Sequence, residues 1–238
     1  MNISTRPYNI EESIYRIEKV LAPSNAIIKV DGDYDIASLE PHQTVDCKMA
    51  CLSVTMHINK FDIDKNENLY KQYKCILSEV GAIVNEIKEA IEYTVLSKNI
   101  LATLIRVSNE DKLDKIIDAA AKICSLLNIL NRKFVEHSLG AISIGVGVSY
   151  NNARLTKETF REGLDSEMLW YGDVVDESIK LSQNARTGFL GNSLMITKSV
   201  YELLSESYRN FFTYDNTVDA FVSSLINKNM EAWLKDNL

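Results

Sequence analysis

Long hydrophobic runs are missing from this sequence. No apolar segment reaches the roughly 18 residues that a membrane-spanning helix needs, and the N-terminal stretch MNISTRPYNIEES has no apolar core of the secretory type. We therefore expect a cytoplasmic protein without a membrane partner. Basic blocks are missing too, since 26 lysines and arginines stand against 33 acidic residues and the net charge is −7. This balance argues against nucleic acid as a partner.

Patterns typical of disulfides and metal sites are equally scarce. The four cysteines form no CxxC pair, and the three histidines are too scattered for a metal motif. Cys47, Cys51, Cys75 and Cys124 lie in apolar neighbourhoods, so buried free thiols are expected. With 238 residues, 46% of them hydrophobic, the chain suffices for one good-sized domain with or without an arm.

The apolar periodicity predicts an N-terminal arm, residues 1–46, followed by a mixed domain, residues 47–238. In the arm, Asn9 is placed to cap a helix whose isoleucines recur at spacings of three and four. Residues 25–44 are expected to cross the surface.

The domain begins with an expected order of strand, helix, strand, strand, helix, strand, over residues 47–58, 69–91, 92–96, 100–107, 111–134 and 139–150. This is the βαββαβ order of ferredoxin-like folds. We predict an α+β fold in which the helices cover one face of a mainly antiparallel sheet. Gly145 and Gly147, in the last of these strands, indicate a bulge or a close backbone approach.

Extra strand–helix units are expected after a loop at 151–166. Met168 to Tyr171 suit a short strand, Gly172 and Asp173 break it, and a helix follows that Gly188 is placed to end. The remaining expected elements are a strand, a helix, two short strands and a closing helix, at 193–196, 197–205, 211–214, 218–222 and 229–234.

This strand–turn–helix resembles that of the class III nucleotidyl cyclases. In that family an aromatic residue, Gly-Asp or Gly-Asn and two apolar residues precede an Asn, and an Arg follows one turn later. Here Trp170-Tyr171-Gly172-Asp173-Val174-Val175 is followed by Asp176 and Lys180. The stretches SLLNILNRKF at 125–134, GVGV at 145–148 and NMEAWL at 229–234 look like the cyclases of bacterial Pycsar antiphage systems. That resemblance implies a pyrimidine cyclase, which makes cyclic CMP or cyclic UMP for a separate effector.

The resemblance also implies two divalent metals, Mg²⁺ or Mn²⁺, held by two aspartates. In this chain His57 and Lys98 stand at the two aspartate positions. Lys60 replaces the glycine that approaches the phosphates, and Phe61 keeps the aromatic residue of that frame. A protonated lysine cannot ligate Mg²⁺, and a single histidine is a poor ligand for it. Two-metal catalysis by the chain's own residues is therefore not expected.

The remaining family positions have changed as well. Asp176 replaces the Asn that orients the ribose, and Lys180 replaces the Arg that grips phosphate, which keeps the charge but loses the bidentate fork. Thr94 and Leu169 stand where adenylate cyclases carry the Lys and Asp that select adenine. Nothing at these positions points to a purine substrate, but pyrimidine members of the family differ there too.

Three hypotheses follow. The first is a degenerate pseudo-cyclase in which Lys60, Lys98 and Lys180 neutralise a bound nucleoside triphosphate. The second is an active pyrimidine cyclase whose metal ligands lie at other positions of the chain or come from another subunit. The third is a dimerising interaction module without nucleotide. Family sites form between two protomers, so we expect a homodimer or a heterodimer with an active cyclase.

Several of these positions also have a purely structural interpretation. His57 suits a buried, hydrogen-bonded histidine, and Lys98 suits a solvated hairpin tip. Asp176 and Lys180 have the spacing of an exposed i, i+4 ion pair.

Overall fold

The computed structural model describes residues 8–22, 27–30, 36–57, 66–97, 99–107, 110–158, 167–186 and 192–237. The chain divides into two compact units: unit 1 is Met1–Lys48 with Asn152–Gly172, and unit 2 is Met49–Asn151 with Asp173–Leu238. Strands β2 (Thr44–His57) and β5 (Ser143–Glu158) run through both units. None of the described helices is long and apolar enough to cross a membrane.

Unit 2 contains the ferredoxin-like core that the sequence predicts. Its strands follow the order β3-β4-β2-β5-β7-β9-β8. The bounds of those not yet given are β3 Ala90–Ser97, β4 Ile100–Arg106, β7 Leu194–Ile196, β8 Thr213–Asp215 and β9 Ala220–Ser223. Helix α2 (Glu67–Val84) connects β2 to β3, and α3 (Glu110–Glu136) connects β4 to β5. The α+β prediction is confirmed, with antiparallel β2–β4 and β3–β4 pairs and a parallel β5–β7 pair.

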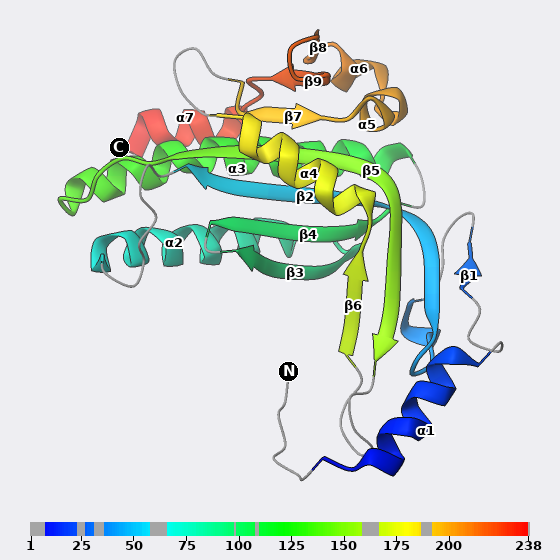
Figure 1. Ribbon diagram of the computed structural model, residues 1–238. Coiled ribbons are helices and arrows are strands. Elements are labelled where there is room, and N and C mark those ends of the chain that lie inside the picture. The colour runs from blue at the N-terminus through cyan, green and yellow to red at the C-terminus, as the bar shows by residue number, and fades with distance from the viewer. Residues whose placement is uncertain are drawn as a thin grey trace. The chain divides into compact units, whose positions relative to one another are not determined.

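The two long helices cover one face of this sheet, as expected. Every second residue of β2 enters the main hydrophobic core, namely Ala50, Leu52, Val54 and Met56. The same core takes Ile76 and Val80 from α2 and a row of apolar residues from α3. The opposite face of β2 belongs to α4 (Asp173–Asn184), which crosses β5 in Figure 1. The remaining helices are α5 Lys198–Leu203, α6 Glu206–Arg209 and α7 Lys228–Asn237.

Several predicted boundaries are wrong, most of all the end of α2 and the end of β5. Helix α2 ends at Val84, not at residue 91, although Ile87 continues the apolar spacing and is buried in the core beyond the helix end. The predicted loop at 151–166 is strand as far as Glu158, because residues 154–158 of β5 pair with β6 (Glu167–Tyr171).

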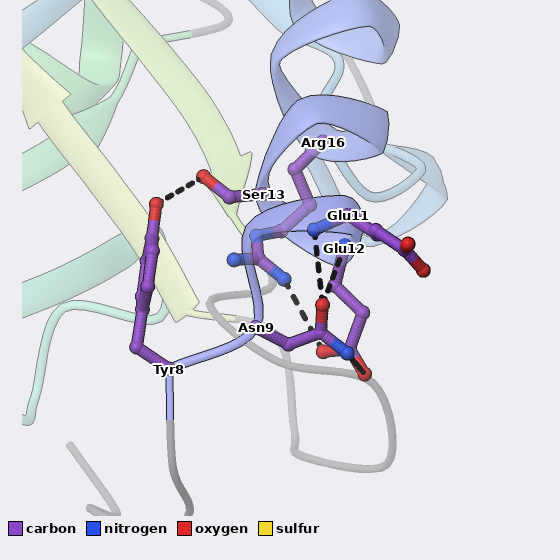
Figure 2. Close-up of polar contacts among 6 residues, drawn as sticks. All are labelled: Tyr8, Asn9, Glu11, Glu12, Ser13 and Arg16. Atoms are coloured by element: carbon purple, nitrogen blue, oxygen red, sulfur yellow. Dashed lines mark hydrogen bonds and ion pairs between the residues drawn. The ribbon is translucent and has the colours of Figure 1, made fainter.

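Unit 1 holds the N-terminal helix, α1 (Ile10–Leu21), with the predicted cap. The side-chain oxygen of Asn9 accepts hydrogen bonds from the backbone N–H groups of Glu11 and Glu12, and the hydroxyl of Tyr8 donates to that of Ser13 (Figure 2). Such a cap satisfies backbone donors that have no partner within the helix. No residue of α1 is buried.

The rest of unit 1 consists of short elements and the ends of the two long strands. Strand β1 (Ile28–Lys29) pairs with β2, and the 3₁₀ turn η2 (Ile36–Ser38) follows. Ile36 and Leu39 are buried, so the expectation that this segment only crosses the surface is wrong for these two residues. Arg154 of β5 forms two hydrogen bonds with the carboxylate of Asp46, at 2.6 and 2.8 Å, and holds the pKa of Asp46 below its usual value.

Candidate functional site

A ladder of polar contacts fastens α4 to β2. Three alternate residues of the strand face three positions of the helix, and each pair is bonded: Ser53 with Ser178, Thr55 with Ser182, and His57 with Ala185. The two hydroxyl pairs lie at 2.7 Å, and all four of these side chains are buried. Strand residues two apart lie on one face, and helix residues three or four apart lie on one face, so the two spacings match. Polar contacts therefore join α4 to β2, whereas Leu181 and Ala185 pack with Met195, Ala220 and Val222 in a small apolar cluster on the same side of the sheet.

Two glycines bring α4 close to the sheet. A Cβ atom on Gly145 would lie 2.1 Å from the carbonyl oxygen of Ala185, and one on Gly147 would lie 2.2 Å from that of Ser178. Neither distance is tolerable for a real side chain, and the obstructing atoms are backbone. The close backbone approach expected at these glycines is confirmed, and α4 lies directly against β5.

His57 uses one ring nitrogen to hold the end of α4. A carbonyl oxygen can only accept, so Nε2 carries the proton that it donates to the Ala185 oxygen across 2.6 Å. Burial lowers the pKa of His57; the bond to Ala185 opposes this shift, and the charge of Arg186 adds to it. The imidazole is therefore neutral at pH 7, and Nδ1 is the ring nitrogen left to accept a bond. His57 is thus a hydrogen-bonded histidine, as its structural interpretation predicts, and its side chain is half-buried.

Asp176 and Lys180 lie on the exposed side of α4. The helix buries Val174, Val175, Ser178, Leu181 and Ser182, which leaves both charged residues facing outward. The expected ion pair between them is not formed, and neither side chain is bonded to another described residue. The two charges are therefore available to a ligand or a second chain.

Thr94 lies on the α4 side of the sheet. It pairs with Ala102 of β4, which pairs with Ser53 of β2, and directly paired residues of antiparallel strands share a face. Leu169, which the resemblance places at the other base-selecting position, is an exposed residue of β6 in unit 1. Lys60, Phe61 and Lys98 fall outside the described residues.

Glu92 and Arg106, which sequence reasoning missed, share that face. Glu92 pairs with Leu104 of β4, and Leu104 pairs with Cys51 of β2. Arg106 of β4 pairs with Met49 of β2. Burial raises the pKa of the Glu92 carboxyl, and the Nε atom of Arg106 is buried without a hydrogen-bond partner in the described part of the chain. The signal in the sequence is the alternation of Glu92 and Thr94 within an otherwise apolar strand. The described residues contain no group of three side chains able to hold a metal ion.

Comparison with known proteins shows which fold the chain shares. No family model matches the sequence. A class III adenylyl cyclase-like ATP-binding protein from Pseudomonas aeruginosa has a TM-score of 0.64 and 16% identity, covering 94% of this chain and 49% of that one. A guanylyl cyclase crystal structure has a TM-score of 0.57 and 11% identity, covering 74% of this chain and 90% of that one. The chain has the fold of the class III nucleotidyl cyclases.

A particular relative is similar along almost the whole chain. The uridylate cyclase of Gulbenkiania mobilis is 23% identical over 234 residues, which are 91% of this chain and 90% of that protein. The resemblance to class III nucleotidyl cyclases, with a pyrimidine cyclase among the similar proteins, is confirmed.

Proposed function

We propose that this protein is a degenerate class III cyclase that binds a pyrimidine nucleoside triphosphate on the α4 side of its sheet without cyclising it. The observation that carries the proposal is the state of His57. It stands where the family has its first metal-binding aspartate, and its Nε2–H is committed to the carbonyl of Ala185. A neutral imidazole with one free nitrogen is a poor site for the hard cations that two-metal catalysis needs.

Positive side chains are proposed to take over the role of the metals. Lys180 is exposed on α4 and bonded to no described side chain, and the sequence adds Lys60 and Lys98. Three lysines supply about the charge that metals and an arginine supply to a triphosphate elsewhere in the family. Arg106, on the same sheet face as Thr94, is a further candidate because its Nε lacks a partner among the described residues.

A pyrimidine base is favoured over a purine. Thr94 and Leu169 lack the charges with which adenylate cyclases select adenine, and the chain is similar to a uridylate cyclase over almost its full length. The resemblance of residues 125–134, 145–148 and 229–234 to the Pycsar cyclases is the basis for proposing a place in such an antiphage system, as a homodimer or as a heterodimer with an active cyclase.

Calorimetric titration with UTP, CTP, ATP and GTP tests this function. We expect UTP or CTP to bind equally well in Mg²⁺ and in EDTA, since lysines replace the metals. Lys180→Glu should weaken that binding at least tenfold, whereas Lys198→Glu, an exposed change on α5, should leave it unchanged. Binding that requires Mg²⁺, or no binding of any nucleotide, contradicts the proposal, and a stable dimer that ignores all four nucleotides favours a pure interaction module.

The second candidate function is an active uridylate cyclase whose missing metal ligands come from another subunit. The full-length similarity to a uridylate cyclase favours it. Its signature is cyclic UMP formed from UTP and Mn²⁺ and abolished by His57→Ala or Asp176→Ala.

A further inference from the structure

A groove between α2 and α3 has no part in the proposed nucleotide site. It has a volume of about 740 Å³ and is lined by residues 68–79 of α2, the last turns of α3 and Leu139. The two helices cover the face of the sheet opposite α4, since the residues of β2 that meet them alternate with those bonded to α4. A volume of this size falls in the range of small-molecule sites.

The floor of the groove is apolar and continuous. Leu126, Leu130 and Phe134 follow one another at intervals of four along α3, and Leu139 extends the line. Residues spaced by four lie above one another on a helix, so 126 to 134 gives an apolar strip about 12 Å long. The strip is suited to an extended hydrocarbon chain.

The rim is basic in a chain whose net charge is −7. Lys71, Lys74, Lys133 and His137 line it, against the single carboxylate of Glu79. Lys71 and Lys133 also form exposed pairs with Glu67 and Glu136, at 2.8 Å each. Such exposed pairs contribute little and exchange easily for another anion.

Lys74 differs from the other two lysines. It has no ion pair with a described residue, and its ammonium lies 5.7 Å from the ring centre of Tyr70. We propose that the groove binds an amphipathic organic anion, a medium-chain acyl carboxylate, whose chain lies on the α3 strip and whose carboxylate meets Lys74 and Lys133. A fully polar anion would find no polar partner on the apolar floor, where Leu126, Leu130 and Phe134 are 4–9% exposed, and a neutral chain would leave the lysines unused.

Cys75 provides a reporter inside the groove. It lines the groove and is exposed, whereas Cys47, Cys51 and Cys124 are buried. The experiment follows the rate at which N-ethylmaleimide, a neutral reagent, modifies Cys75 in the full chain, by intact mass. Cys75→Ser identifies the fast adduct. We expect saturating decanoate to slow the reaction at least fivefold and decanol to have no comparable effect.

Charge-reversal variants test whether Lys74 and Lys133 bind the carboxylate of decanoate. The double variant Lys74→Glu, Lys133→Glu should weaken decanoate binding at least tenfold in calorimetry, and the matched control Lys198→Glu should bind as the unchanged chain does. Both variants should keep their affinity for UTP, which separates this groove from the nucleotide site. Equal protection by decanol, undiminished binding in the double variant, or protection only by an acidic helical peptide would overturn the proposal.

Discussion

The Nε2–H of His57 donates a hydrogen bond to the carbonyl oxygen of Ala185, which joins the end of β2 to the residue that follows α4. The resemblance to the class III cyclases places His57 at the position of a metal-binding aspartate, and this remains a prediction. In the structure, His57 joins two elements of the fold.

Replacing His57 by alanine should lower the free energy of unfolding. The loss should be about 1 kcal/mol, the usual net value of one hydrogen bond, with more if the Ala185 carbonyl is left without a partner. Urea denaturation followed by circular dichroism measures it. His57→Gln, which keeps an N–H donor, is the control, and an unchanged stability in His57→Ala would show that the bond has no structural role.

The stability of the protein should also depend on the protonation of His57. Its pKa is lowered in the folded state from the usual 6.5, so the unfolded chain binds more protons below that pH. The contribution of His57 is then fully present above about pH 6.5 and is lost as the pH falls toward the folded pKa. Denaturation midpoints at several pH values should show this slope, and His57→Gln should reduce it.

Gly147→Ala should destabilise unit 2 severely. Its Cβ would meet the backbone oxygen of Ser178 at 2.2 Å, and a cost of about 3 kcal/mol or more is expected because α4 must move from the sheet. Gly140→Ala is the matched control, because its Cβ meets nothing within 4 Å. Equal thermal stability of the two variants would show that α4 does not need its close contact with β5.

The effects of replacing Ser53 and Ser178 on stability should be coupled in a double-mutant cycle. Ser53→Ala or Ser178→Ala alone removes the 2.7 Å contact, at a cost of about 1 kcal/mol each, because the Ser178 hydroxyl also donates to the Val175 carbonyl and the Ser53 hydroxyl also contacts the Cys51 thiol. The double variant should cost less than the sum of the two by about 1 kcal/mol. Strict additivity in urea denaturation would contradict a direct bond.

Only one of the four thiols should react quickly in the native protein. Burial raises the pKa of Cys51 and of Cys124 to about 11, and burial also raises that of Cys47. Thiolates are the reactive form, so one fast adduct, on Cys75, is expected from the native protein and four after denaturation. Fast modification of Cys51 would indicate that the α4 side of the sheet opens readily.

Local signals made much of the fold predictable from the sequence. The cap at Asn9 and the isoleucine spacing after it are local in the sequence and together predict α1. Both are present in the structure. The end of α2 could not be predicted in this way, because Ile87 is buried by the core and continues the apolar spacing past the last helical residue. The extension of β5 to Glu158 depends on pairing with β6 and on the Arg154–Asp46 contact, neither of which is local.

The strand–turn–helix of the candidate site could be predicted from the sequence, but the side-chain contacts of its residues could not. The Trp170 to Val175 pattern indicated the strand–turn–helix, and Gly145 and Gly147 indicated a close approach. The partners of Ser178 and Ser182 could not be predicted, because they lie on β2, more than a hundred residues earlier in the chain. The register of β3 against β4 and β2 is what places Glu92 and Arg106 on the face of Thr94.

Mass spectrometry of the protein incubated with UTP, CTP, ATP and GTP in Mn²⁺ distinguishes a pseudo-cyclase from an active cyclase. We expect a folded protein that binds a pyrimidine nucleotide and forms no cyclic monophosphate above the level of a protein-free control. Cyclic UMP or cyclic CMP that accumulates with the unchanged chain and disappears with Asp176→Ala would contradict it, and would identify an active pyrimidine cyclase with an unusual metal site.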